Sequence, residues 1–207
     1  MLKNTFLLLT ILSFCLTSCG YKETKTAMKH GEKLKSSIND FEANRVKLSS
    51  KLVEGLENAG TALSAENPDL PKVSKDFEKE WTSIQSRYNK LKSNFEKVGS
   101  NSEAYFAKLD ELSGSIGNEE LRNEELAKNA ELRTKWQSTY DKAEVSVNKV
   151  TEVLAAGHDF HMVLVASSIR QKLEQNVGEL NLIAEQAKTL LADLEGFTQA
   201  GRDLVEG

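Results

Sequence analysis

Two histidines lie three residues apart in the last third of the chain, and this spacing could support metal binding. His158 and His161 would share one face of a helix, where they could supply two ligands to a metal ion. A third ligand would have to come from another helix, and no sequence feature supplies one. The Glu-x-x-His pattern of di-iron bundles is missing because residue 155 is alanine. The alternative is a structural role, since His161 falls on an apolar helix face.

Gly157 precedes this pair and leaves room either for a bound molecule or for close approach of a second helix. Residues 157–161 are therefore the region that a small-ligand or metal carrier would use. The rest of the chain has no glycine-rich phosphate loop, no Gly-x-Ser-x-Gly elbow and no distinctive carboxylate pair. The sequence predicts no catalytic residue, no cofactor and no enzyme activity.

Cys19 closes a segment that is typical of an export signal. Lys3 gives a positive start, residues 6–16 are almost wholly apolar, and two small residues precede the cysteine. The run of residues 16–19 (Leu-Thr-Ser-Cys) resembles a bacterial lipobox, which implies that Cys19 becomes the mature N-terminus and carries acyl chains. The apolar run is about half of the roughly 20 residues that a membrane-spanning helix needs. An ordinary secretory signal that happens to contain a cysteine is the alternative.

This resemblance divides the chain into three parts. Residues 1–18 are expected to be a signal peptide, residues 19–23 a lipidated tether, and residues 24–207 a helical bundle domain. Gly20 follows the cysteine; by resemblance to lipoprotein sorting, an aspartate there would favour the inner membrane. We therefore expect a cell-envelope protein on the outer membrane that faces the periplasm. Cys15 and Cys19 are the only cysteines, so the mature domain has no disulfide and no thiolate metal site.

The charge balance limits the possible partners. The chain has a net charge of −4, and removal of Lys3 with the signal peptide would make it about −5. An acidic chain without a basic tract offers no footprint for nucleic acid and no polybasic patch for anionic lipids. The expected partners are a membrane, reached through the N-terminal lipid, and a helical protein or a second copy of the chain.

Four stretches carry apolar residues at alternating spacings of three and four, which is the pattern of packed helices. Arg45 lies on the first of these seams. Asn176 is a polar residue on the last seam, where such a residue often fixes register or oligomer state. Four aromatic residues also fall on them and are expected to be core rather than a ligand box: Trp81, Tyr88, Trp136 and Tyr140. In chain order, the seams run over residues 34–52, 77–116, 136–164 and 169–204.

Breaks between the stretches predict four helices over about 24–62, 72–114, 119–165 and 169–205. A loop is expected over residues 58–71, which hold both prolines, and a tight connection over 113–118, where Asn118 can cap the next helix. Ser167 or Ser168 is expected to cap the last helix. Gly99-Ser100-Asn101 looks like a turn, but the seam passes through it in phase, so the prediction keeps one helix there.

Helices of matched length, each about 55–70 Å long, with short connections predict an all-α fold. The expected architecture is an elongated antiparallel up-down-up-down four-helix bundle. The alternative is a three-helix, spectrin-like rod with the first helix docked loosely.

The order of features from Leu91 onward resembles an uncharacterised family of helical bacterial lipoproteins, known only as a domain of unknown function. The resemblance rests on residues 104–109 (Ala-Tyr-Phe-Ala-Lys-Leu), 120–122 (Glu-Leu-Arg) and 152–159, with Ala27-Met28 near the start. Residues 165–168 depart from the family's asparagine-rich turn before the last helix. The family supplies no activity, so the leading interpretation is a non-catalytic, lipid-anchored scaffold, spacer or partner-binding module.

Overall fold

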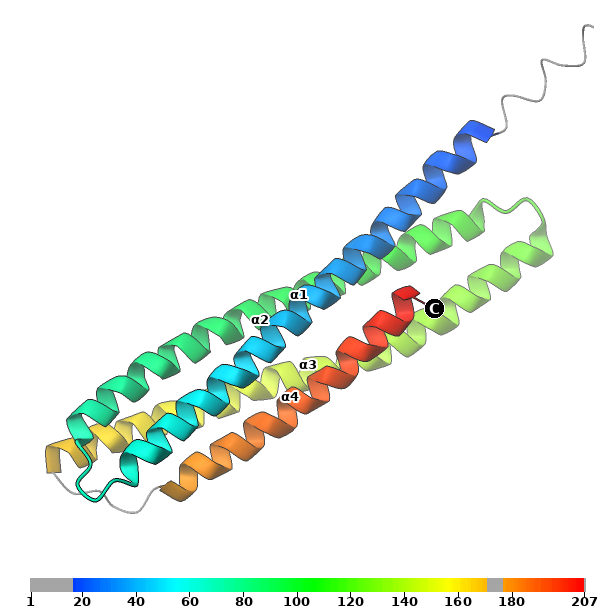
Figure 1. The fold of residues 1–207 in the computed structure, drawn as a ribbon. Coiled ribbons are helices and arrows are strands. Elements are labelled where there is room, and N and C mark those ends of the chain that lie inside the picture. The colour runs from blue at the N-terminus through cyan, green and yellow to red at the C-terminus, as the bar shows by residue number, and fades with distance from the viewer. Residues whose placement is uncertain (1–16, 171–176, 207) are drawn as a thin grey trace, which may run out of the picture.

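The computed structural model describes residues 17–170 and 177–206, and every regular element in these ranges is a helix. The predicted all-α fold is therefore confirmed. Figure 1 shows four long helices running side by side. They are α1 (Thr17–Leu63), α2 (Leu70–Gly114), α3 (Glu119–Arg170) and α4 (Val177–Glu206).

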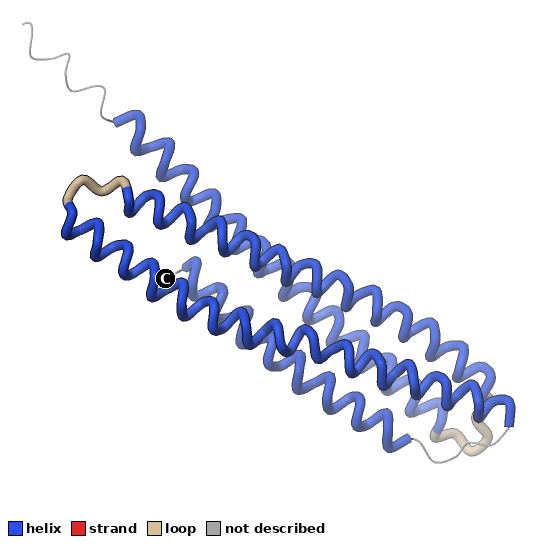
Figure 2. The backbone as a smooth tube through the Cα atoms, turned by 180° about the vertical axis from the view of Figure 1, so that it is seen from behind, coloured by secondary structure: helices blue, strands red, loops and turns tan. Residues whose placement is uncertain are grey.

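Successive helices run in opposite directions, and the first closes on the last. Within the described ranges, the backbone of α1 lies beside those of α2 and α4, and α3 lies beside the same two helices. The backbones of the diagonal pairs stay apart, so these pairs meet only through side chains in the core. This is the predicted up-down-up-down arrangement, visible from both sides in Figures 1 and 2. Leu34, Ile38 and Phe41 of α1 are fully buried, so the first helix is an integral part of the bundle and the three-helix alternative does not hold.

The predicted seams form the core of the bundle. Part of this core is a cluster of aromatic rings. Phe41 of α1, Phe95 of α2 and Phe197 of α4 have ring centroids 5.3–5.9 Å apart. Tyr140 of α3 stacks on Phe95 at 4.3 Å, so all four helices meet in one cluster. Full burial of each phenylalanine contributes about 1.5–3 kcal/mol. Trp81, Tyr88 and Trp136 are buried as predicted, and Tyr140 packs half-buried against the core.

Residues 99–101 remain helical, as the unbroken phase of the seam predicted. The hydroxyls of Ser100 and Ser102 donate to carbonyls of the preceding turn, at 3.0 and 2.7 Å. These bonds allow serine to sit inside a helix without ending it. The missing side chain of Gly99 leaves room for Tyr140, whose hydroxyl oxygen would lie 2.6 Å from a Cβ at that position.

Two helix starts have clear side-chain caps. Asn118 caps α3 as predicted, because its Oδ1 accepts a hydrogen bond from the Leu121 amide at 3.0 Å. Asp69 caps α2 by accepting from the Lys72 amide, and Pro71 lies in the first turn, where its missing N–H costs nothing.

The predicted start of the first loop is wrong, because α1 continues past Asn58 to Leu63. Leu56, Ala59 and Leu63 extend the buried stripe by two turns. Burial of these side chains outweighs the cost of about 1 kcal/mol for Gly60 in a helix interior. The other end of α1 also differs from prediction, since the helix begins at Thr17 rather than near residue 24. Residues 1–16 of the expected signal peptide lie outside the described residues.

The predicted boundary between the third and fourth helices is also wrong. The helix α3 runs to Arg170, so neither Ser167 nor Ser168 caps α4. Ser167 is fully buried, and the Ser168 hydroxyl donates to the Val165 carbonyl at 2.7 Å within the helix. Ile169, expected in the core of the last helix, is 78% exposed on α3. Leu173 and Asn176 of the predicted seam lie outside the described residues.

The helices are not matched in length, because α4 has 30 residues whereas α3 has 52. An ion pair of 2.7 Å between Lys35 and Glu206 places the end of α4 beside the second quarter of α1. Beyond this level only α1, α2 and α3 continue (Figure 1). We call this end, with the start of α1 and the 115–118 loop, the open end. The opposite end, with the 64–69 loop, is the closed end.

Candidate binding site at the closed end of the bundle

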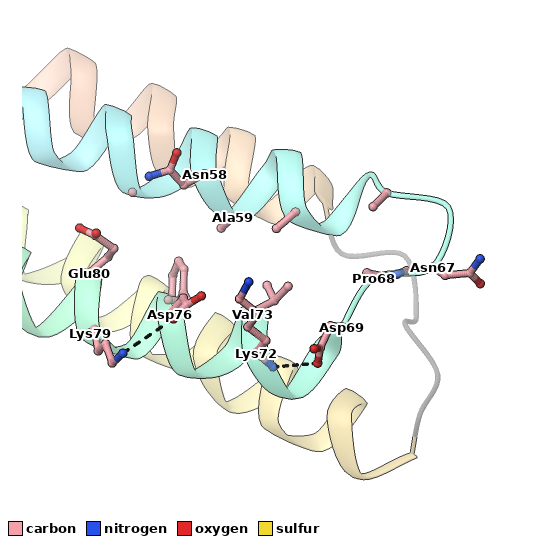
Figure 3. Close-up of a pocket in the computed structure, with 14 residues that line it drawn as sticks. Asn58, Ala59, Asn67, Pro68, Asp69, Lys72, Val73, Asp76, Lys79 and Glu80 are labelled. Carbon is pink, nitrogen blue, oxygen red and sulfur yellow. Dashed lines mark hydrogen bonds and ion pairs between the residues drawn. The ribbon is translucent and has the colours of Figure 1, made fainter.

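A groove of about 480 Å³ lies between the last turns of α1 and the first turns of α2. Small residues of α1 and of the loop that follows it form one wall, and Val73 and Phe77 of α2 form the other. In Figure 3, Ala59 and Val73 face one another across the groove. Because the small residues have short side chains, the space between the two helices is left unfilled. The small residues are Gly55, Ala59, Ala62 and Ala65.

Side chains of both positive and negative charge surround this apolar groove. Asp76 pairs with Lys79 at 3.8 Å along α2. Glu80 accepts from Lys51 of α1 at 3.3 Å and so bridges the two helices at one end of the groove. Hydrogen bonds that Lys51 donates to the carboxylates of Glu54 and Glu80 raise the pKa of Lys51, which therefore stays charged. The remaining lining residues are Asn58, Asn67, Pro68, Asp69 and Lys72. The groove thus offers an apolar interior with hydrogen-bonding and charged groups at its edge.

The α2 wall of the groove is fixed by aromatic packing behind it. Phe77 stacks on Trp81 with centroids 5.2 Å apart and planes at 14°, and it meets Phe160 of α3 edge-on at 5.3 Å. The Trp81 indole nitrogen donates to the Leu154 carbonyl at 3.0 Å. Tyr88 of α2 is held against α3 in the same way, because its hydroxyl donates a hydrogen bond to the Val147 carbonyl at 3.2 Å. The groove is therefore a preformed feature of the packed core.

The structure places the predicted histidines behind this wall. His161 is half-buried and stacks against Phe77 at 6.4 Å, whereas His158 is exposed to solvent. Gly157 lies against Trp81, so its missing side chain serves close helix approach. Within residues 17–170 and 177–206, no three His, Cys, Asp or Glu side chains gather closely enough to hold a metal ion.

Cys19, the predicted lipidation site, lies in the first turn of α1 at the open end. The helix runs without a break from this residue to the groove. From Cys19 to Ala59 the separation along the helix is about 60 Å at 1.5 Å per residue. None of the described helices has a stretch that is long and apolar enough to cross a bilayer.

Arg45, the charged residue on the first seam, joins α1 to α4. It is 8% exposed and donates two hydrogen bonds to Glu42, at 2.7 and 2.8 Å, and a third to the Leu191 carbonyl of α4 at 2.9 Å. Thr198 donates to the same carboxylate at 3.0 Å. The hydrogen bond from Arg45, joined by the one from Thr198, lowers the pKa of Glu42. All of these groups are satisfied within the bundle, which indicates a structural role.

Tyr140 is the other polar group with a strongly altered environment. Burial, together with the nearby carboxylates of Glu144 and Glu96, raises the pKa of Tyr140 to about 12. Its phenol therefore stays protonated at neutral pH and carries no negative charge that could act as a base.

Comparison with known proteins gives no match: no family model, no curated protein and no solved structure is similar to the chain. Sequence reasoning missed the groove because two helices form it together. The only local signal was the repeated small residue on one face of α1, at Gly55, Ala59 and Ala62. That pattern is also compatible with close helix packing, so the sequence alone does not separate a groove from a filled interface.

Proposed function

We propose that the chain is a non-catalytic, lipid-anchored protein of the bacterial cell envelope that presents the closed-end groove to a helical protein partner. The observation that carries this proposal is the position of two features on one helix. Cys19 lies at the start of α1, and the groove lies beside its last turns, about 60 Å away. A continuous helix between an anchor and a recognition site acts as a spacer that holds the site at a set distance from the membrane.

The lipobox-like residues 16–19 and the resemblance to helical lipoproteins support the anchor. In this proposal residues 1–18 are removed, Cys19 is acylated, and the bundle faces the periplasm from the outer membrane. Several acyl chains hold a protein firmly, since each buried CH₂ contributes about 0.8 kcal/mol. This anchor would serve a chain whose described helices include no membrane-spanning stretch.

The groove supports a protein partner through its shape and its edge. Apolar small residues allow a partner's side chains to approach the backbone of α1, and the surrounding charges provide hydrogen-bond partners. Helical segments commonly bind in this manner, with an apolar face laid into a groove between helices. Lys72 and Lys79 on one side, with Asp76 and Glu80 nearby, would select for a complementary arrangement of charges.

The anchor and the groove are tested separately. Metabolic labelling with a fatty acid should mark the wild type and not Cys19→Ser; an unlabelled wild type would refute the anchor. A photo-crosslinking residue at Ala65, which is exposed and lines the groove, should give one discrete adduct in the native envelope. The same residue at Leu182, which is 66% exposed on α4, is the control. Equal labelling at both positions, or none at Ala65, would contradict the partner proposal.

Small-ligand carriage is the second proposal, and the size of the groove favours it. A volume of about 480 Å³ lies within the range of about 300–1,000 Å³ that is typical of small-molecule pockets. Ala62→Phe should fill the groove and reduce binding of an apolar fluorescent probe, whereas Ala127→Phe on the exposed face of α3 should not. For the metal form of this proposal, which uses His158 and His161, zinc titration of the wild type and His158→Ala gives the test. Equal zinc affinity of the two would refute it.

A further inference from the structure

A second apolar stripe runs along the solvent side of α3 near the closed end, apart from the groove. Met162 is 53% exposed and Ile169 is 78% exposed. They belong to a set spaced by three, four, three and four residues, which places all members along one line of the helix. We call this set the α3 stripe; it consists of Ala155, His158, Met162, Val165 and Ile169.

The α3 stripe lies in a stretch that is nearly free of charge. Between Val153 and Ile169, Asp159 is the only aspartate, glutamate, lysine or arginine, although 28% of the whole chain is charged. Val145 makes the contrast clear. It is also 53% exposed on α3, but Asp141, Lys142 and Lys149 surround it in the sequence, and it has no apolar neighbour at heptad spacing on the solvent side.

We infer that the α3 stripe pairs with the same stripe of a second copy, with the two α3 helices parallel and in register. Alternating spacings of three and four are the repeat of a two-stranded seam. In such a seam Ala155, Met162 and Ile169 occupy one class of position, and His158 and Val165 occupy the other. Each residue then meets its own counterpart.

The parallel direction follows from the anchor. Copies tethered at Cys19 to one membrane stand the same way up, so their closed ends lie at the same height and equal residues face each other. This orientation rests on the proposed lipid anchor. A second copy supplies a matching apolar face that is nearly free of charge, since Asp159 is the only aspartate, glutamate, lysine or arginine between Val153 and Ile169 and is not itself a member of the stripe. Histidine at a seam position supplies a polar contact of the kind that fixes register.

Confinement to a membrane raises the local concentration of each copy near the other, so a short seam is enough for two copies to pair. Two molecules held in one surface meet with an effective concentration set by their tethers rather than by bulk solution. The pairing is therefore measured on the full-length chain in native membranes.

Disulfide trapping tests this inference sharply because the chain has no cysteine after Cys19. Full-length Ala155→Cys, Met162→Cys and Ile169→Cys should each form a covalent dimer on mild oxidation, since a disulfide needs Cα atoms about 4.4–6.8 Å apart. Val145→Cys, with the same exposure as Met162, is the matched control and should remain monomeric. The wild type reports any background from Cys15 and Cys19.

The alternatives give different outcomes. An antiparallel pair would trap Met162→Cys alone and would join Ala155→Cys to Ile169→Cys only when both are co-expressed; this result would overturn the inference. Absence of trapping at all three positions would overturn it as well, and so would an adduct with a different protein. Adding Met162→Glu should abolish trapping at Ile169→Cys, whereas adding Val145→Glu should not. Fatty-acid labelling of the same samples reports the anchor independently, so failure of the anchor and failure of the pairing are distinguishable.

Discussion

Gly157 of α3 lies directly against the indole ring of Trp81 of α2. A Cβ atom built on Gly157 would fall 1.8 Å from Cζ2 of the ring, far inside any van der Waals contact. The contact brings the ring close enough to donate its indole hydrogen to the Leu154 carbonyl. Phe77, which belongs to the α2 wall of the groove, stacks on the same Trp81 ring. The glycine therefore sets the spacing of α2 and α3 beneath the candidate binding site.

Gly157→Ala should destabilise the bundle by about 1–3 kcal/mol, the usual cost of overpacking a core, because the Trp81 ring must move. Gly196→Ala on the exposed face of α4 is the matched control, since a Cβ atom added there would meet no neighbouring atom of the described residues within 4 Å. Alanine is the better helix former, so this control should gain about 0.5–1 kcal/mol. Chemical unfolding of both variants measures the difference. Equal effects would show that the ring does not constrain position 157.

Trp136→Ala should destabilise the bundle by about 3–5 kcal/mol, as truncation of a large buried aromatic does. Trp136 is 4% exposed and packs on Phe197 with centroids 5.3 Å apart. A change within about 0.5 kcal/mol, typical of surface positions, would contradict this placement. Thermal or denaturant unfolding provides the measurement.

The two tryptophans should respond differently to phenylalanine. The indole nitrogen of Trp136 is buried without a hydrogen-bond partner among the described residues, whereas that of Trp81 donates to a carbonyl. Trp136→Phe removes an unsatisfied donor, which offsets part of the lost packing, whereas Trp81→Phe also loses a hydrogen bond worth about 0.5–1.5 kcal/mol. Trp81→Phe should therefore be the more destabilising change in the same unfolding assay. The reverse order would refute this account.

Glu42→Gln should weaken the bundle at pH 7 by about 1–3 kcal/mol, because the carboxylate accepts charged hydrogen bonds from Arg45. Arg45 holds the pKa of Glu42 below its ordinary value of 4.5. A lowered pKa in the folded state gives stability that is complete above the unfolded value and is lost as pH falls through the folded value. The difference between wild type and variant should thus shrink below about pH 4. Unfolding free energies measured at decreasing pH provide the test. A difference between wild type and Glu42→Gln that stays constant with pH would contradict this account.

Asn118→Ala should cost about 1 kcal/mol through loss of the cap on α3. Asn123→Ala makes the same substitution one turn later, at an exposed helical position, and should be neutral or slightly stabilising. Comparison of the two unfolding midpoints separates the cap from the general effect of alanine. Equal midpoints would show that the cap hydrogen bond adds nothing.

The sequence predicted the four helices and most of the core because burial repeats with the helical period. Phe77 to Val98 of α2 and Ala143 to Leu154 of α3 needed only the spacing of apolar residues. The sequence was less informative at helix ends, where weak local conformational preferences compete with the burial of apolar side chains. Gly60 did not stop α1, and Ser167 did not start α4, because neighbouring apolar side chains remain in contact with the core.

The candidate site could not be predicted because its geometry depends on two helices at once. Ala59 and Val73 face one another only after α1 and α2 have packed at a particular height. His161 illustrates the opposite case, since its place on an apolar face correctly indicated partial burial. Ile169 shows how an error in one helix boundary moves a residue from core to surface. That error concealed the α3 stripe from sequence reasoning.

The short α4 has a mechanical consequence. The bending stiffness of a bundle rises steeply with the number of helices in its cross-section, and only α1, α2 and α3 continue beyond the level of the Lys35–Glu206 pair. The molecule thus combines a rigid four-helix shaft with a more compliant neck next to Cys19. Thermal bending is therefore concentrated in the neck. With the proposed anchor in place, the closed end would sweep sideways over the membrane surface while its height changes little.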